Sequence, residues 1–201
     1  MQYDFVEFLQ SLFEHFWNEP SIPNHLNEDI FGGLFQECYK CECGNIEKQP
    51  IKMLPDILSL PIEGETVQTC LDAYLASEEI VRRCSNCKSM KSSRSSEILV
   101  PPSTLILHLK RFFYDESEER VTKLHVPVFC PLNLLINNSV MYQFNAVINH
   151  MGESSSAGHY NILFHGKEEN NFILVDDSDI QYNANISDVN RVSYVVVYDK
   201  L

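Results

Sequence analysis

The strongest hydrophobic pattern lies at the start of the chain, in residues 3–17. Apolar side chains recur there at steps of three and four residues, which is the spacing of one broad face of an amphipathic helix. They are Phe5, Phe8, Leu9, Leu12, Phe13 and Phe16. Pro20 and Pro23 follow and are expected to end the helix. The segment is therefore predicted to form a helix whose aromatic face packs on a core.

A second, shorter helix is predicted within residues 66–83. Leu71, Leu75 and Ile80 would lie on or near one of its faces. Thr69 and Asp72 have the spacing of a capping box and are expected to close its first turn. The polar, basic segment that follows, residues 84–96, is expected to be a turn region.

From residue 97 onward the hydrophobic pattern changes to a period of two, which is typical of β-strands. Short turn-like segments separate these stretches, and an additional strand is predicted before them. The predicted strands are residues 57–62, 104–113, 142–149, 159–165, 172–175 and 192–198. Sequential strands with short connections favour antiparallel pairing. The predicted fold class is therefore α+β with a mainly antiparallel sheet.

Composition and charge narrow the classes of function. The chain has 201 residues and a net charge of −13, which argues against a nucleic-acid partner because phosphate binding needs a basic surface. No apolar run reaches the ~18 residues that span a bilayer, so no membrane partner is expected. The first residues are polar and acidic, unlike a signal peptide. We therefore expect a cytoplasmic or nuclear location.

Seven cysteines fall mostly into two tight clusters, which in a reducing compartment favours metal binding over disulfides. The downstream pair is Cys84 and Cys87. Upstream, Cys38 and Cys41 have the better spacing for a second pair of thiolate ligands, and Cys43 is an alternative ligand. Four thiolates predict a structural Zn²⁺ site. Cys41 and Cys84 lie 43 positions apart, so the two segments must run side by side.

A candidate general base lies in the segment Gly-His-Tyr at residues 158–160. His159 precedes Asp176 and Asp177, which follow the next predicted strand. A carboxylate there is expected to accept the Nδ1 hydrogen of His159 and fix the orientation of the ring. His150, on the end of the preceding strand, is a second candidate.

Several segments together resemble the ubiquitin-specific proteases, which are papain-like deubiquitinating enzymes. The segments occur in the family's order and cover nearly all of the chain. They are "QYDFVEFLQSLFE", "FGGLFQ", "TCLDAYLASEEI", "PPSTLILHLKRFFYD", "AVINHMGESSSAGHY" with "VDDSDI", and "VSYVVVYDKL". The resemblance implies one partial catalytic domain, 1–201. Its parts would be the end of the helical thumb (1–35), zinc-binding fingers (36–100) and a palm with the histidine box (101–201).

The resemblance also implies roles for individual residues. His159 matches the general base, Asp176 the residue that orients it, and Asp177 a neighbour that helps the oxyanion site. The cysteine clusters match the zinc site of the fingers. Ubiquitin, or a protein that carries it, is the implied partner. Acidic residues would border the groove for the basic tail of ubiquitin: Asp115, Glu116, Glu118, Glu119 and Glu153.

The nucleophile that the resemblance implies is missing from this sequence. The family's catalytic cysteine precedes the segment that starts here at Gln2. Cys70 and Cys130 match a helix of the fingers and a strand of the palm, so neither is expected to serve. Phe172 and Val175 also depart from the aromatic residues usual before the acidic pair. We therefore expect that the chain alone does not hydrolyse isopeptide bonds.

Two other interpretations remain open at this point. The chain can be a non-catalytic module that binds ubiquitin or another partner, or a zinc-stabilised scaffold without ubiquitin contact. In the absence of most of the thumb, the aromatic face of the helix at residues 3–17 would be partly exposed. Such a face favours aggregation or a partner that covers it.

Overall fold

The computed structural model describes residues 4–19, 21, 30–53, 57–155, 157–166 and 171–201. In the part of the chain that the structure describes, the strands are accompanied by the α-helices α1 (Phe5–Asn18) and α3 (Val67–Leu75) and by a short 3-10 helix η1 (Ile186–Val189). Most strand pairs are antiparallel, which confirms the predicted α+β class. Neither α1 nor α3 is long and apolar enough to cross a membrane, and the same holds for the rest of the described chain.

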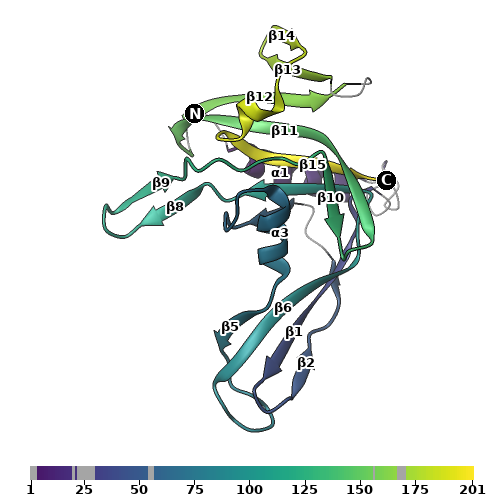
Figure 1. Ribbon diagram of the computed structural model, residues 1–201, viewed down its shortest axis with the longest axis vertical. Coiled ribbons are helices and arrows are strands. Elements are labelled where there is room, and N and C mark those ends of the chain that lie inside the picture. Colours follow the sequence, from purple (N-terminus) through teal and green to yellow (C-terminus); the bar gives the residue numbers. More distant parts are fainter. Residues whose placement is uncertain (1–3, 20, 22–29, 54–56, 156, 167–170) are drawn as a thin grey trace.

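An eight-stranded sheet, which we call the palm sheet, forms the upper part of the molecule (Figure 1). Only its β4–β7 pair is parallel. In spatial order the strands are β14 (Asp179–Tyr182), β13 (Phe172–Asp176), β12 (Ala157–His165), β11 (Val140–Ser154), β15 (Ser193–Lys200), β7 (Thr104–Leu109) and β4 (Ile57–Leu60), with β10 (Asn133–Ile136) paired to β11. Five of the predicted strands each match a strand of this sheet: 57–62, 142–149, 159–165, 172–175 and 192–198. The predicted strand 104–113 is divided, because β7 ends at Leu109 and Phe112 begins a strand of a separate hairpin.

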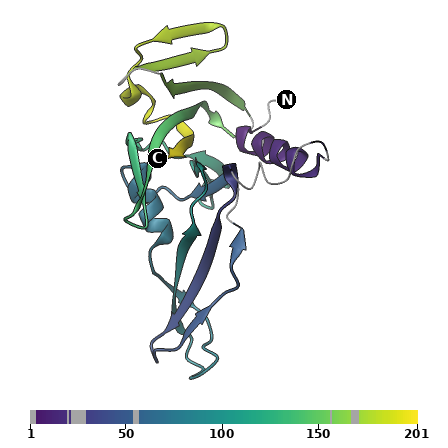
Figure 2. The same cartoon turned by 90° about the vertical axis from the view of Figure 1, so that its right-hand side faces the viewer.

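A five-stranded sheet, the fingers sheet, projects away from the palm sheet (Figures 1 and 2). Its strands are β2 (Ile46–Lys48), β1 (Leu34–Cys41), β6 (Lys91–Val100) and β5 (Glu78–Val81), with β3 (Lys52–Met53) beside β1. A separate two-stranded hairpin joins β8 (Phe112–Asp115) to β9 (Arg120–Lys123).

The palm sheet is buried on both faces, because neighbouring positions of its strands enter two different cores. On β7, Leu105 and Leu107 belong to the core on the α3 side, whereas Ile106 belongs to the core on the α1 side. On β15, Val196 and Val195 divide in the same way. Strands that are covered on both faces have nearly continuous apolar sequences, and β7 and β15 are of this kind.

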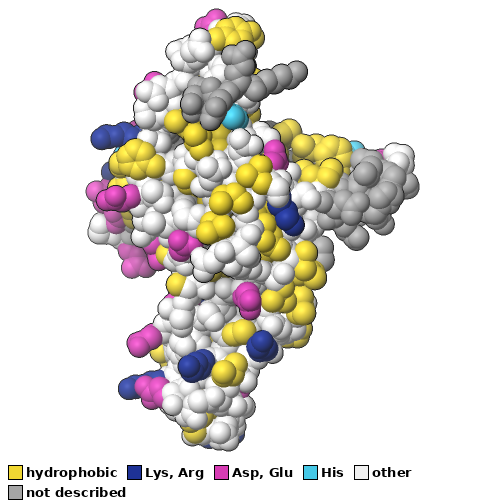
Figure 3. Space-filling model, turned by 45° about the vertical axis from the view of Figure 1, so that its right-hand side comes forward, with side chains coloured by type: hydrophobic (Ala, Val, Ile, Leu, Met, Phe, Trp, Pro, Cys, Tyr) yellow, Lys and Arg dark blue, Asp and Glu magenta, His cyan; other side chains and the backbone are white. Residues whose placement is uncertain are grey.

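Helix α1 confirms the first predicted helix and lies against one face of the palm sheet (Figure 2). Val6 and Phe13 are buried in this contact. Phe8 and Phe16 stay 54% and 37% exposed, and hydrophobic side chains are visible on α1 where it projects from the palm (Figure 3). The aromatic face is therefore only partly covered. Pro20 and Pro23 lie outside the described residues.

Asp4 explains why α1 begins and docks where it does. Its Oδ1 accepts hydrogen bonds from the backbone N–H of Val6 at 2.8 Å and of Glu7 at 3.4 Å, as an N-cap carboxylate does. Its Oδ2 accepts the hydroxyl hydrogen of Tyr194 on β15 at 2.7 Å. One carboxylate thus caps the helix and attaches it to the palm sheet.

The second predicted helix was extended too far and capped at the wrong residue. Helix α3 ends at Leu75, and Ile80 lies on β5. The capping box joins Thr66 to Thr69 rather than Thr69 to Asp72. The β-branched residues after the helix pair with β6, and this tertiary pairing overrides the helical spacing.

The predicted turn region was also too long. Residues 91–96 are the first part of strand β6, which pairs with β1 on one side and β5 on the other. The segment is rich in serine and basic residues and has no apolar alternation. Pairing on both edges, rather than a hydrophobic face, holds it extended.

Arg111 is a fully buried cation between the β7 strand and the β8–β9 hairpin. Its guanidinium donates five hydrogen bonds, four of them to backbone carbonyls of two separate segments. The acceptors are the carbonyls of Leu124, Val126, Asn190 and Ser193 at 2.6–3.0 Å and the Ser193 hydroxyl at 3.1 Å. Burial lowers the pKa of Arg111 to about 10, so the group is still protonated near neutral pH.

We expect Arg111→Met to lower the free energy of unfolding by about 2–4 kcal/mol, because several buried carbonyls lose their donor. Urea denaturation measures this change. Lys110→Met is the matched control, since Lys110 is exposed and the change there should stay within about 0.5 kcal/mol. Equal stability of the two variants would contradict a structural role for the buried guanidinium.

Candidate functional site

Strand pairing brings His159 and Asp176 together at one edge of the palm. His159 lies near the start of β12, and Asp176 is the last residue of β13, its neighbour. Side chains two residues apart on a strand share a face, so Asn161 lies beside His159. His159 Nε2 donates to Asp176 Oδ1, and Asn161 Nδ2 donates to Asp176 Oδ2 at 3.2 Å. The Asp176 carboxylate is thus held by His159 and Asn161, which lie on the same face of β12.

The contact changes the proton affinity of both groups. The hydrogen bond with Asp176 raises the pKa of His159 above its ordinary value. The hydrogen bond from His159, and next that from Asn161, lowers the pKa of Asp176. Their side chains are 43% and 38% exposed, so solvent and other molecules can reach the pair.

The ring is oriented differently from the sequence-based expectation. The carboxylate was expected to accept from Nδ1, but it contacts Nε2. Nδ1 is consequently the ring nitrogen left to exchange a proton with an incoming group. An imidazole oriented by a carboxylate in this way can act as a general base.

Asp177 lies next to this pair in the tight connection from β13 to β14. Its φ of +51° is in the left-handed region, which asparagine and aspartate tolerate better than most residues. Ligand atoms of His159, Asp176 and Asp177 lie within 4.8 Å of one another. The three predicted catalytic residues are thus brought together, with Asp177 the most exposed.

His150, the second candidate base, has a different environment. It is fully buried, and its Nδ1 faces the ammonium of Lys123 at 3.0 Å. Burial and next the charge of Lys123 lower its pKa. His159, not His150, therefore has the carboxylate partner and the exposure that a base requires.

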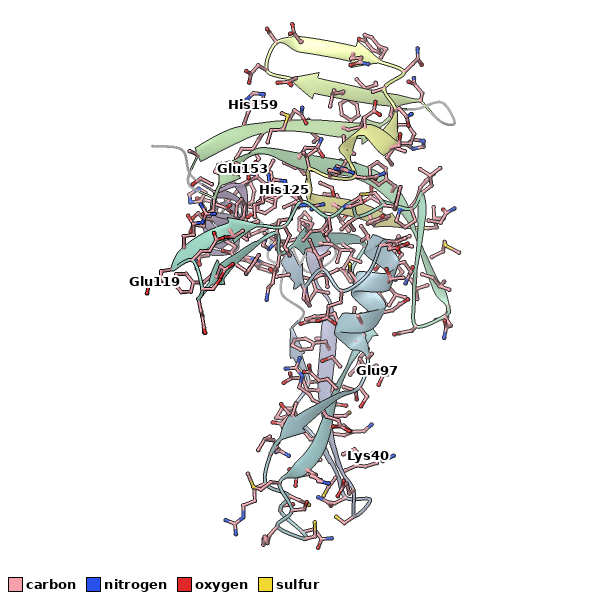
Figure 4. The ribbon with its side chains drawn as sticks, turned by 60° about the vertical axis from the view of Figure 1, so that its left-hand side comes forward. Lys40, Glu97, Glu119, His125, Glu153 and His159 are labelled. Atoms are coloured by element: carbon pink, nitrogen blue, oxygen red, sulfur yellow. The ribbon has the colours of Figure 1, made fainter. Side chains whose placement is uncertain are left out.

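The acidic residues expected to border a groove lie on two neighbouring loops. Asp115 ends β8, Glu116, Glu118 and Glu119 lie in the connection to β9, and Glu153 lies at the end of β11. His125 contacts Glu153 at 2.8 Å, which links the segment after β9 to the end of β11. Figure 4 shows Glu119 at the tip of the projecting hairpin and Glu153 near His125.

Four cysteines meet at the tip of the fingers sheet. Cys41 ends β1 and Cys43 lies in the turn after it, and Cys84 and Cys87 come from the turn before β6. The sulfurs of Cys41 and Cys87 are 3.5 Å apart, and those of Cys43 and Cys84 are 3.8 Å apart. Tetrahedral zinc–thiolate bonds of about 2.3 Å place sulfurs about 3.8 Å apart, so the four thiols fit such an ion.

Cys38 is not part of this group, which corrects the predicted set of four. It lies inside β1, opposite Lys48 of β2 and Ser95 of β6, whereas Cys43, the predicted alternative, takes its place. The physical reason is the turn after β1, where Gly44 has a φ of +86°. This turn folds back so that residues 41 and 43 face the same point.

Polar groups around the cysteine cluster favour the ionised form of Cys84. The backbone N–H of Cys87 donates to the Cys84 sulfur and is the main cause that lowers the pKa of Cys84 to about 6. The side-chain amide of Asn45 donates to the same sulfur at 3.7 Å, and that of Asn86 to Cys43 at 4.0 Å. Such outer donors are common around metal-bound thiolates.

The remaining two cysteines lie in the palm core. Cys70 is buried on α3, and Cys130 is buried after the β9 segment. Burial raises the pKa of Cys130 to about 12, so it stays a neutral thiol near neutral pH. Neither thiol is among the described ligand groups that surround His159.

We expect His159 to titrate above the ordinary value for histidine, and Asp176→Asn to return its pKa toward that value. The carboxylate stabilises the imidazolium, so the protonated form persists as pH rises until the raised pKa is passed. NMR titration of the imidazole signals measures both. Asp179→Asn, in the same hairpin, is the control and should leave the His159 titration unchanged. A wild-type His159 that titrates at the ordinary value would contradict the contact.

The chain is similar to known proteins of one family. The family model described as ubiquitin carboxyl-terminal hydrolase matches residues 1–198. Ubiquitin carboxyl-terminal hydrolase 4 of Arabidopsis thaliana is 30% identical over 76% of this chain and 44% of that protein. Ubiquitin carboxyl-terminal hydrolase 46 of Caenorhabditis elegans is 30% identical over 89% of this chain and 44% of that protein. This chain thus spans less than half the length of these relatives.

Solved structures share the fold. The SAGA Ubp8/Sgf11/Sus1/Sgf73 DUB module bound to ubiquitin aldehyde contains a chain that matches with a TM-score of 0.83 and 20% identity. The match covers 98% of this chain and 49% of that one. A second structure of the module, bound to monoubiquitin, matches with a TM-score of 0.82 and 21% identity over 98% of this chain and 48% of that one. With the family model over almost the whole sequence, these findings show that the chain belongs to the ubiquitin carboxyl-terminal hydrolase family.

Proposed function

We propose that this chain provides the general base, its orienting carboxylate and a ubiquitin-binding surface for thiol-dependent hydrolysis of isopeptide bonds at the C-terminal glycine of ubiquitin. The observation that carries the proposal is the contact between His159, near the start of β12, and Asp176, at the end of β13, where both side chains are accessible to solvent. In this role the free Nδ1 of His159 takes the proton of a thiol and later returns it to the leaving amine. Asp176 holds the ring through Nε2, and Asp177 assists at the oxyanion.

The nucleophilic thiol, we propose, is none of the seven cysteines of this chain. Four of them gather at the tip of the fingers sheet, and Cys38 lies within that sheet. Cys70 and Cys130 are buried in the palm core, and Cys130 has a raised pKa. A nucleophile must be within about 3 Å of its base and form a thiolate readily. The chain alone would therefore bind ubiquitin without cleaving it.

Charge supports ubiquitin as the partner. The tip of the β8–β9 hairpin is acidic, and Glu153 at the end of β11 contacts His125 in the segment after β9. A basic peptide tail would be attracted to these carboxylates. The structures matched above include modules bound to monoubiquitin and to ubiquitin aldehyde. A second candidate function, a non-catalytic module that binds ubiquitin, is favoured by the same placement of the cysteines. The retained His159–Asp176 pair favours the catalytic role.

We also propose that the cysteine cluster holds a structural Zn²⁺ ion, with Cys41, Cys43, Cys84 and Cys87 as ligands. The sulfur spacing and the soft donor set support this choice of metal. When bound, the ion would connect the turn after β1 to the turn before β6. Its contribution would be to stability of the fingers sheet rather than to chemistry.

Ubiquitin is expected to bind this chain reversibly, whereas ubiquitin with a thiol-reactive group at its C-terminus forms no adduct. Fluorescence titration and intact-protein mass spectrometry measure these two outcomes. Charge reversal of Glu118 and Glu119 together should weaken binding severalfold, and more so at low salt. An adduct that disappears on replacement of Cys70 or Cys130 would contradict the placement of the nucleophile. The absence of binding at high micromolar ubiquitin would contradict the binding surface.

Zinc binding is expected to depend on Cys43 and not on Cys38. Cys43→Ser removes one of the four clustered thiols, so the purified variant should lose its zinc, whereas Cys38→Ser should retain it. Metal analysis by mass spectrometry measures the content, and a chelator should lower the melting temperature of the wild type and Cys38→Ser alike. Zinc loss in Cys38→Ser with retention in Cys43→Ser would contradict the ligand set.

A further inference from the structure

Lys123 is a second buried cation, with a contact set that the proposed reaction does not use. It ends strand β9 and is only 6% exposed. Its ammonium donates to the carbonyls of His150 and Gly152, both at 2.8 Å, and faces His150 Nδ1 at 3.0 Å. The ring of Phe112 lies on another side, 5.7 Å from the nitrogen.

These contacts fix the protonation state of His150. A lysine ammonium has three donors and no acceptor, so Nδ1 of His150 must accept and its proton must be on Nε2. Burial lowers the pKa of both Lys123 and His150, and the charge of Lys123 further lowers that of His150. A second positive charge on the imidazole would meet the ammonium at van der Waals distance, so the ring stays neutral.

The carbonyl that Lys123 contacts at Gly152 belongs to an irregular part of the β11–β12 hairpin. The register shifts between Met151 and Ser154, and Gly152 has a φ of +127°. Backbone groups at such a bulge leave the regular ladder and need other partners. The ammonium therefore stabilises the place where the hairpin departs from ideal pairing.

The other side of the His150 ring lies against β12, the strand that carries His159. A Cβ atom on Gly158 would lie 2.2 Å from His150 Nε2, a distance that atoms cannot share. Nε2 is buried and has no hydrogen-bond partner among the described groups. The ring thus occupies the space beside Gly158, the residue immediately before His159.

We propose that Lys123 is a positioning residue for His159: its ammonium holds the hairpin bulge at Gly152 and the ring of His150, and His150 in turn sets the backbone at Gly158. These contacts end at Gly158, the residue before His159, and Lys123 itself does not contact the His159 side chain among the described contacts. The proposal rests on the proposed function only in the role given to His159. The position of the imidazole relative to Asp176 is a property of this chain and can be measured without ubiquitin.

The test compares Lys123→Met and Lys123→Gln with the wild type, by NMR titration of His159 and by amide hydrogen exchange. In Lys123→Met we expect His159 to lose at least half of the upward displacement of its pKa, because the ring no longer stays against Asp176. Amides of residues 150–155, 157 and 158 should exchange roughly tenfold faster, since one or two hydrogen bonds are lost. Lys123→Gln keeps two donors and should show a smaller change in the same direction.

Two controls separate positioning from general loss of stability. Arg120→Met alters an exposed residue of the same strand and should leave His159 unchanged. Leu71→Ala destabilises the core through α3 and should lower global stability without a change in the His159 titration. If Lys123→Met does not fold, the titration of His159 in Lys123→Gln is the test of the proposal.

A folded Lys123 variant in which His159 titrates as in the wild type would overturn the proposal. So would an equal shift in Leu71→Ala, which would make the effect one of stability. Because neither readout involves ubiquitin or a nucleophile, failure here leaves the proposed function standing. Conversely, a chain that does not bind ubiquitin can still show the positioning effect.

Discussion

The palm depends on one buried positive charge that has carbonyls, rather than a carboxylate, as partners. Removing a guanidinium from water is costly, and only a complete set of acceptors offsets that cost. Arg111 obtains this set from residues 124–126 and 190–193, which are far apart in the sequence. The charge therefore requires both segments to be in place, and this fixes where the β8–β9 hairpin leaves the core and where β15 enters it.

The site follows from that arrangement. The entry of β15 sets the register of β11, β11 sets β12, and β12 carries His159 to the end of β13. No long loop intervenes between this scaffold and the His159–Asp176 pair, so the pair is held by strands. A site placed on regular strands keeps its geometry better than one placed on loops.

Much of this architecture could be predicted from the sequence, because the spacing of apolar residues along the chain follows which side chains the fold buries. The helix at α1 and the apolar palm strands followed from spacing and order. Spacing left Asp176 and Asp177 both open as partners of His159, and the family resemblance assigned Asp176. The remaining features depend on contacts that spacing does not encode. Serine-rich residues 91–96 are strand only because β1 and β5 flank them. Cys43 replaces Cys38 because of a turn at Gly44, and the ring nitrogen that meets Asp176 is decided by the side from which the carboxylate approaches.

The order of the palm strands has a consequence for biosynthesis. Strand β15 lies between β11 and β7 in the sheet, yet it follows every other strand in the sequence. The same strand holds Tyr194, whose contact with Asp4 spans 190 positions. During translation the pairing of the two halves of the palm, and the Asp4–Tyr194 contact of helix α1, must therefore wait until β15 has left the ribosome. Until then the nascent chain presents two open strand edges and an undocked apolar helix, which is the kind of species that molecular chaperones retain.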